Sequence, residues 1–314
     1  MDEVPATHTP DDFEQFPARV PEHVRQERRL AATAKRRIRD IWGGSLDLLV
    51  ALLHESRAMG DQFLRLEYET AKTSNDLVFF ATMHLHANAC LVTSEVITLL
   101  EAGYSSGATA RWRSLHEVAV YAMFIVKHGP GTAERYLRHG HIKDWEDLPA
   151  VDEMLRRSGD EEFSRSEDEK LAKLKAQLLE RYGDEFKGGL GWAKEACPKK
   201  GGLAFKDIAE DVGLSVLDSF YRSASHFVHP TWKGIIDNGG LPSDLNGEAL
   251  LAGPSEHGIW TPAMLTVRSI YGATFSFLTC RADSAWLPKL MQLSKLVEHA
   301  SDQLRKIRDG RSVM

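Results

Sequence analysis

The spacing of apolar residues predicts that this chain is built from α-helices. Beginning near Pro21, apolar side chains recur every three or four residues, which places them on one face of a helix. Two glycines, Gly43 and Gly44, are expected to interrupt this helix, and a second one follows over residues 45–59. Residues 1–20 contain three prolines among acidic and small residues, a composition that predicts an extended N-terminal arm.

Two central helices are expected next. Ser74 or Asn75 is expected to cap a helix over residues 76–100, and Gly103 is expected to end it. A second helix is expected over residues 107–127. Its second half is apolar on all sides, which is typical of a helix surrounded by other helices.

The remaining pattern predicts peripheral helices and one long irregular loop over residues 231–262, rich in glycine and proline. No stretch alternates β-branched and polar residues over the length of a strand. We therefore expect an all-α multi-helix bundle that forms one domain over residues 21–314. The other expected helices are 132–156, 166–182, 205–211, 215–229, 262–282 and 287–308.

The composition favours a folded cytoplasmic protein. Apolar residues make up 43% of the chain, too many for general disorder. The three cysteines are far apart in sequence, which argues against a disulfide framework. The first residues are acidic and lack the features of a secretory signal, and the longest unbroken apolar run, residues 118–126, is too short to span a bilayer. We expect no membrane contact.

The charge is unevenly distributed. A net charge of −6 gives no general attraction to nucleic acid, yet one short N-terminal segment is strongly basic. Such a patch can bind RNA or DNA even on an acidic protein. The alternative is that these side chains are the solvated face of the first helix. The candidate nucleic-acid-binding residues are Arg25, Arg28, Arg29, Lys35, Arg36, Arg37 and Arg39.

Two expected helices carry polar residues that a packed helix would not select for stability. Each residue advances about 100° around an α-helix, so Arg222, His226 and His229 share one face, and Arg113 and Glu117 share another. Burying a guanidinium or an imidazole is unfavourable unless the group is paired. These residues therefore either face each other inside the bundle or line a wet cleft, and they form the best candidate site.

The spacing from Arg222 to His229, and from Arg111 to His116, fits the arginine–histidine motif of HEPN proteins, many of which are RNases. The spacing alone is weak evidence, because a chain of this composition is expected to contain about three such pairs by chance. The chain also resembles an uncharacterised bacterial family with HEPN-like helical bundles. In that family a helix with Arg-x-x-x-Glu, here Arg113 and Glu117, precedes a helix with Tyr-x-x-x-Ser-x-x-x-His, here Tyr221 to His229.

This resemblance implies a metal-independent endoribonuclease, without a cofactor, in a toxin or antiphage system. His229 would be the general base or acid, Arg222 the phosphate clamp and His226 the second proton carrier, with His116 a further candidate from the spacing. Arg113 and Glu117 would position these groups. The resemblance further implies a homodimer whose two sites face one cleft, and a partner protein such as an antitoxin.

A non-catalytic alternative explains the same residues. Arg113 and Glu117 can pair within their own helix, and Tyr221, Ser225 and His226 could satisfy them from the facing helix. The network would then fix the packing of two helices in a helical interaction or scaffold protein.

Metal binding is a third reading of the sequence. His86 and Cys90 lie one turn apart on the same expected helix, with His84 nearby, and His139 and His141 flank a glycine. No further ligand motif completes a coordination shell, so histidines packed in the core are the simpler explanation and we predict no metal site.

Overall fold

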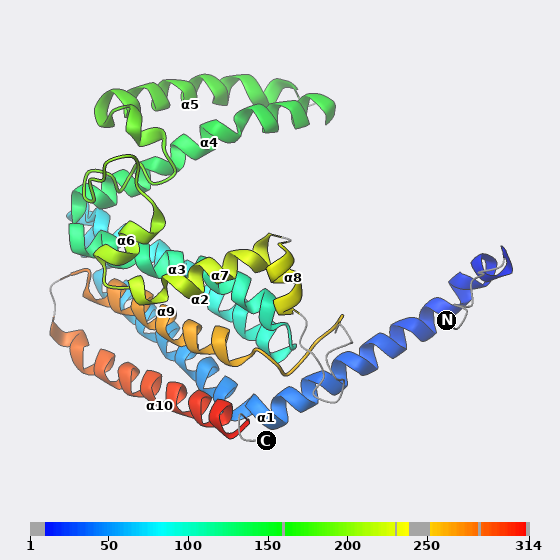
Figure 1. The fold of residues 1–314 in the computed structure, drawn as a ribbon. Coiled ribbons are helices and arrows are strands. Elements are labelled where there is room, and N and C mark those ends of the chain that lie inside the picture. Colours follow the sequence, from blue (N-terminus) through cyan, green and yellow to red (C-terminus); the bar gives the residue numbers. More distant parts are fainter. Residues whose placement is uncertain (1–9, 159–160, 230, 239–251, 282–283, 312–314) are drawn as a thin grey trace.

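The structure is a computed structural model that describes all residues except 1–9, 159–160, 230, 239–251, 282–283 and 312–314. The described part of the chain is helical and contains no strand, so the predicted all-α bundle is confirmed (Figure 1). Its elements are α1 (Pro10–Thr73), α2 (Leu77–Glu101), α3 (Ser105–His128), α4 (Pro130–Ser158), α5 (Glu161–Tyr182), η1 (Asp184–Lys187), α6 (Phe205–Asp211), η2 (Ser215–Leu217), α7 (Asp218–Val228), α8 (Trp232–Asn238), α9 (Trp260–Thr279), η3 (Ser284–Trp286) and α10 (Leu287–Arg311).

The centre of the bundle is formed by α2, α3 and α9, which pack against one another. One hydrophobic cluster joins them to α1, α7 and α10, and a second joins α2 and α3 to α4, α5 and the segments around α6. Val118 and Cys280 pack against both clusters. The α4–α5 hairpin and the N-terminal half of α1 project from this body (Figure 1).

α2 is the most apolar helix of the bundle. By length and composition it could cross a membrane, but 56% of the residues in its apolar window are buried inside the protein. The helix therefore belongs to the core of the bundle. Its first turn is fixed by Asp76, whose side chain accepts a hydrogen bond from the Phe79 amide at 3.0 Å. The cap is therefore Asp76, and the expected caps Ser74 and Asn75 lie just before it.

α1 corrects two predictions. It begins at Pro10, so residues 10–20 are helical where an extended arm was expected, and residues 1–9 lie outside the described part. It also continues through Gly43 and Gly44 without interruption. The reason is tertiary packing: Trp42 and Leu46, on either side of the glycines, are 4% and 2% exposed, and burying two such side chains outweighs the roughly 1 kcal/mol that each helical glycine costs.

Two further boundaries differ from the sequence prediction. The expected helix over residues 215–229 is divided into η2 and α7, and α7 ends where expected, because His229 adopts extended dihedral angles before Pro230. The expected irregular loop contains α8, and the described residues 252–259 run without helix to the start of α9.

We predict opposite effects for two glycines of α1. A Cβ on Gly60 would lie 2.4 Å from Cε1 of His86 in α2, so Gly60→Ala should lower the free energy of unfolding by about 1–3 kcal/mol. A Cβ on Gly44 would meet nothing within 4 Å, so Gly44→Ala should raise it by about 0.5–1 kcal/mol. Urea unfolding measures both. Similar effects of the two substitutions would contradict the close approach of α1 and α2.

Candidate functional site

Tyr221 links α7 to α3 through two charged residues. Its hydroxyl accepts a hydrogen bond from Nη2 of Arg113 at 2.8 Å and donates one to Oε1 of Glu117. Arg113 and Glu117 also form an ion pair within α3, with Nη2 and Oε1 3.4 Å apart. The phenol ring of Tyr221 stacks on Phe205, with ring centres 4.2 Å apart. One side chain of α7 thus makes polar and aromatic contacts at once.

The electrostatics of this cluster keep the phenol protonated. Burial, followed by the hydrogen bond to Glu117, raises the pKa of Tyr221 to about 12. Burial and the charge of Glu117 raise the pKa of Tyr121, on the same helix as Glu117, as well. At neutral pH Tyr221 is therefore a hydrogen-bond donor, and Glu117 is its acceptor.

The cluster matters because α7 has little other anchorage. Ala224 is the only residue of this helix that is fully buried. A hydrogen bond to a charged partner contributes about 1.5–3 kcal/mol, less where solvent screens it, and the side chains of Arg113 and Glu117 are 29% and 31% exposed. The structure therefore contains part of the non-catalytic network considered above, with Tyr221 as the partner from α7.

The other polar candidates of this region are Arg222 and His226 on α7 and His229, which directly follows the helix; they are here called the Arg–His face. The side chain of Arg222 is 74% exposed and pairs with Asp218 one turn earlier, at 3.2 Å. His229 is exposed at the end of the helix. His226 is half-buried, and its Nδ1 lies 3.1 Å from Oγ1 of Thr231.

Arg113 and Glu117 do not face the Arg–His face, although the sequence predicted that these two groups of polar residues would lie together. Tyr221 points to Arg113 and Glu117, whereas Arg222 is the next residue along α7 and its side chain is open to solvent. Of the three residues expected to satisfy Arg113 and Glu117 from α7, only Tyr221 does so, because His226 pairs with Thr231. Arg113 and Glu117 therefore influence the Arg–His face only by seating the helix that carries it.

His116 lies inside the bundle. It is 1% exposed, its ring stacks on Trp112 with centres 5.1 Å apart, and neither ring nitrogen has a hydrogen-bond partner in the described part of the chain. Burial lowers its pKa to about 4. A neutral imidazole sealed among aromatic rings cannot reach a polymeric substrate, so the geometry gives no support to His116 as a catalytic group.

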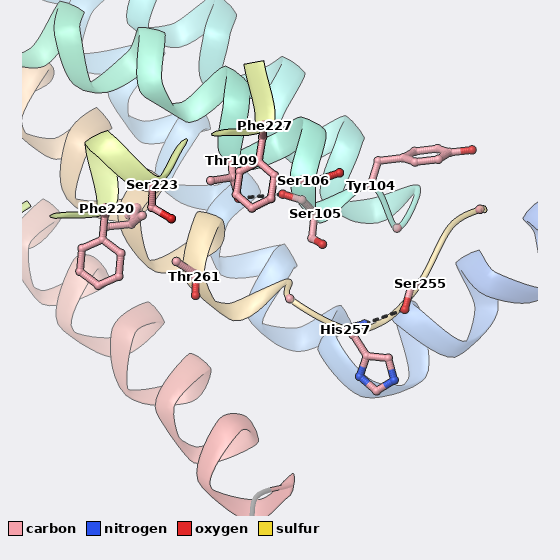
Figure 2. Close-up of a pocket in the computed structure, with 14 residues that line it drawn as sticks. Tyr104, Ser105, Ser106, Thr109, Phe220, Ser223, Phe227, Ser255, His257 and Thr261 are labelled. Carbon is pink, nitrogen blue, oxygen red and sulfur yellow. Dashed lines mark hydrogen bonds between the residues drawn. The ribbon is translucent and has the colours of Figure 1, made fainter. Parts of the chain in front are cut away.

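A cavity of about 370 Å³ lies on a third side of α7 (Figure 2). Phe220, Ser223 and Phe227 line it from α7, and hydroxyl groups line it from the starts of α3 and α9. The sequence contained one indication of this wall of the cavity: the spacing places those three residues on one face of a helix. The other walls come from segments far apart in sequence, and we did not predict the cavity.

The basic segment is exposed on the projecting half of α1 (Figure 1). Three of its residues form ion pairs: Arg25 with Glu22, Arg37 with Glu256 and Arg39 with Asp47. Arg36 donates a hydrogen bond to Thr33. Arg28, Arg29 and Lys35 have no acidic partner among the described residues. α1 packs mainly on α2, α9 and α10. The basic segment is therefore a surface separate from the Arg–His face.

The histidines considered as metal ligands have other neighbours. Nε2 of His86 lies 3.7 Å from Sγ of Cys90 and 3.3 Å from Oγ1 of Thr274, and Nε2 of His139 lies 2.9 Å from the carbonyl of Gly188. Within the residues that the structure describes, no group of three or more His, Cys, Asp or Glu side chains is placed to hold a metal ion.

These features define an all-α helical bundle with a tyrosine-linked ion pair between two of its helices. A family of unknown function, DUF5677, matches residues 79–247, which is more than half of the chain, and the chain belongs to this family. The match spans most of α2 and all of α3 and α7. Neither a curated protein nor a solved structure matches the chain. The family match does not extend to HEPN proteins, so that resemblance stays a prediction.

Acid should destabilise this protein through its buried histidines. Burial lowers the pKa of His116, and that of His86, from about 6.5 to about 4, so between these values the unfolded chain binds protons that the folded chain does not. Stability is therefore complete above pH 6.5 and falls as the pH drops towards 4, by up to roughly 3 kcal/mol per histidine.

The check is the melting temperature of wild type and His116→Phe between pH 7 and pH 4.5. The variant should lose less stability over this range, whereas His54→Gln, at an exposed site on α1, should behave like wild type. Equal acid sensitivity of wild type and His116→Phe would show that His116 is not held neutral by burial.

Proposed function

We propose that the protein binds RNA and cleaves it without a metal ion at the Arg–His face of α7. The observation that carries the proposal is that one exposed guanidinium and one half-buried imidazole lie on α7, and that a second, exposed imidazole directly follows its last residue. The family match assigns no activity, so the proposal depends on this geometry and on the arginine–histidine spacing.

The three side chains suit cleavage by the ribose 2′-hydroxyl. His229 removes the proton from that hydroxyl, and its oxygen attacks the adjacent phosphorus. The bond from phosphorus to the 5′-oxygen breaks, and Nε2 of His226 donates a proton to the leaving oxygen. Arg222 stabilises the charge that builds on the phosphate. The products are a 2′,3′-cyclic phosphate and a 5′-hydroxyl.

The surroundings of the Arg–His face suit a single-stranded substrate. The ion pair between Arg222 and Asp218 is exposed and worth about 0–1 kcal/mol, so a phosphate can displace it. Trp232, three residues after His229, is 76% exposed and offers a surface on which a base can stack. The basic surface of α1 would add contacts to the RNA backbone.

The setting we propose is a toxin or antiphage system in the cytoplasm. A homodimer would place two Arg–His faces on one RNA, and an antitoxin would restrain the activity. The second candidate function is a non-catalytic interaction protein. It is favoured by Val20, Val24 and Leu30, which are 40%, 40% and 56% exposed on the projecting half of α1 and offer apolar contacts to a partner.

We expect the purified protein to cleave tRNA or single-stranded RNA in the presence of EDTA and to leave 2′,3′-cyclic phosphate ends. His229→Ala should reduce the rate at least about 100-fold, because it removes one proton carrier. His54→Ala, a substitution of an exposed histidine on α1, is the matched control and should keep the wild-type rate. No cleavage, or equal rates for wild type and His229→Ala, would rule out the catalytic proposal.

A further inference from the structure

The cavity beside α7 is enclosed by segments that other contacts hold in place. The described residues before α9 are fixed to the turn between α2 and α3 by the Ser255 amide, which donates to the Gly103 carbonyl at 2.9 Å. They are fixed to α1 by the indole of Trp42, which donates to the Glu256 carbonyl at 3.1 Å. The cavity is thus largely preformed, and its volume of about 370 Å³ lies in the lower part of the range typical of small-molecule sites.

Part of the cavity lining consists of hydroxyl groups that the protein leaves available. Thr109 donates to the Ser105 carbonyl, and Oγ of Ser255 accepts from the His257 amide. The hydroxyls of the four other serine and threonine residues of the lining have no hydrogen-bond partner in the described part of the chain. Figure 2 shows them on both sides of the hollow. These four residues are Ser105, Ser106, Ser223 and Thr261.

The cavity lining also contains apolar and aromatic side chains. Phe220 and Phe227 line the cavity from α7, two turns apart (Figure 2). Leu265 lines it from α9. Phe220 is 38% exposed, although its side chain is large and apolar. A ligand with a flat apolar surface can cover these rings and remove them from water.

Among the residues that the structure describes, the lining contains no lysine, arginine, aspartate or glutamate, and His257 is its only histidine. An ionised ligand would find no opposite charge to pair with inside the cavity. The complementary ligand is therefore uncharged, carries several hydroxyl groups, and has a flat ring.

We propose that this cavity binds a nucleoside. The ribose hydroxyls would pair with the free serine and threonine hydroxyls, and the base would pack on the phenyl rings of α7. The proposal is independent of RNA cleavage, because no residue of the Arg–His face lines the cavity. A loss of adenosine binding and a loss of RNA cleavage can therefore be observed separately.

The test is isothermal titration calorimetry of the full chain with adenosine, ribose and AMP. Adenosine should bind at one site per chain, ribose at least about tenfold more weakly because it lacks the base, and AMP no more tightly than adenosine because no cation faces its phosphate. No binding of adenosine, or equal binding of ribose, would overturn the proposal. Tighter binding of AMP than of adenosine would show an anion site and would overturn the inference that the ligand is uncharged.

Substitutions of cavity residues test whether adenosine binds in this cavity. Ser223→Ala should weaken adenosine about fivefold by removing one hydrogen bond. Phe227→Leu should weaken adenosine by a similar factor and leave the weak binding of ribose unchanged, because it removes only the aromatic surface. Ser219→Ala, an exposed serine of α7 outside the cavity, is the matched control and should bind like wild type. Adenosine binding that is unchanged in both cavity variants would place the ligand elsewhere.

Discussion

The hydroxyl group of Tyr221, held between Arg113 and Glu117, is the interaction on which the candidate functional surface of this protein depends. α7 is a short helix that fully buries a single alanine, so apolar packing alone holds it weakly. Tyr221 adds two hydrogen bonds to charged groups and a stacked contact with Phe205. The contact of Tyr221 with α3 therefore helps to fix the positions of the candidate residues on α7.

The three sides of α7 face different surroundings. One side carries Tyr221 and Ala224 and anchors the helix on α3. A second side presents Phe220, Ser223 and Phe227 to the cavity, and the third presents the Arg–His face to solvent. The geometry of the α-helix separates these groups, so substitutions can probe each side alone. Any ligand that alters how α7 sits on α3 would act on the other two sides through the same anchor.

The sequence predicted the helical architecture well, because most helices begin and end at residues with clear local preferences. It failed at Gly43 and Gly44, where burial of Trp42 and Leu46 keeps α1 intact despite two poor helix formers. It anticipated the pairing of Arg113 with Glu117 and the contact with Tyr221 as one alternative. The solvent-open position of Arg222 and the burial of His116 depend on how helices pack, and helical spacing alone does not determine that. The cavity depends on three segments meeting, so the spacing of Phe220, Ser223 and Phe227 was its only sequence signal.

The most direct test of this account is a double-mutant cycle with Arg113→Met and Tyr221→Phe, measured as free energies of unfolding in urea. Because the guanidinium and the phenol are in direct contact, the account predicts that the two substitutions are coupled by about 1 kcal/mol, with the double variant less destabilised than the sum of the single variants. Additive effects would contradict the claim that this contact holds α7 on α3.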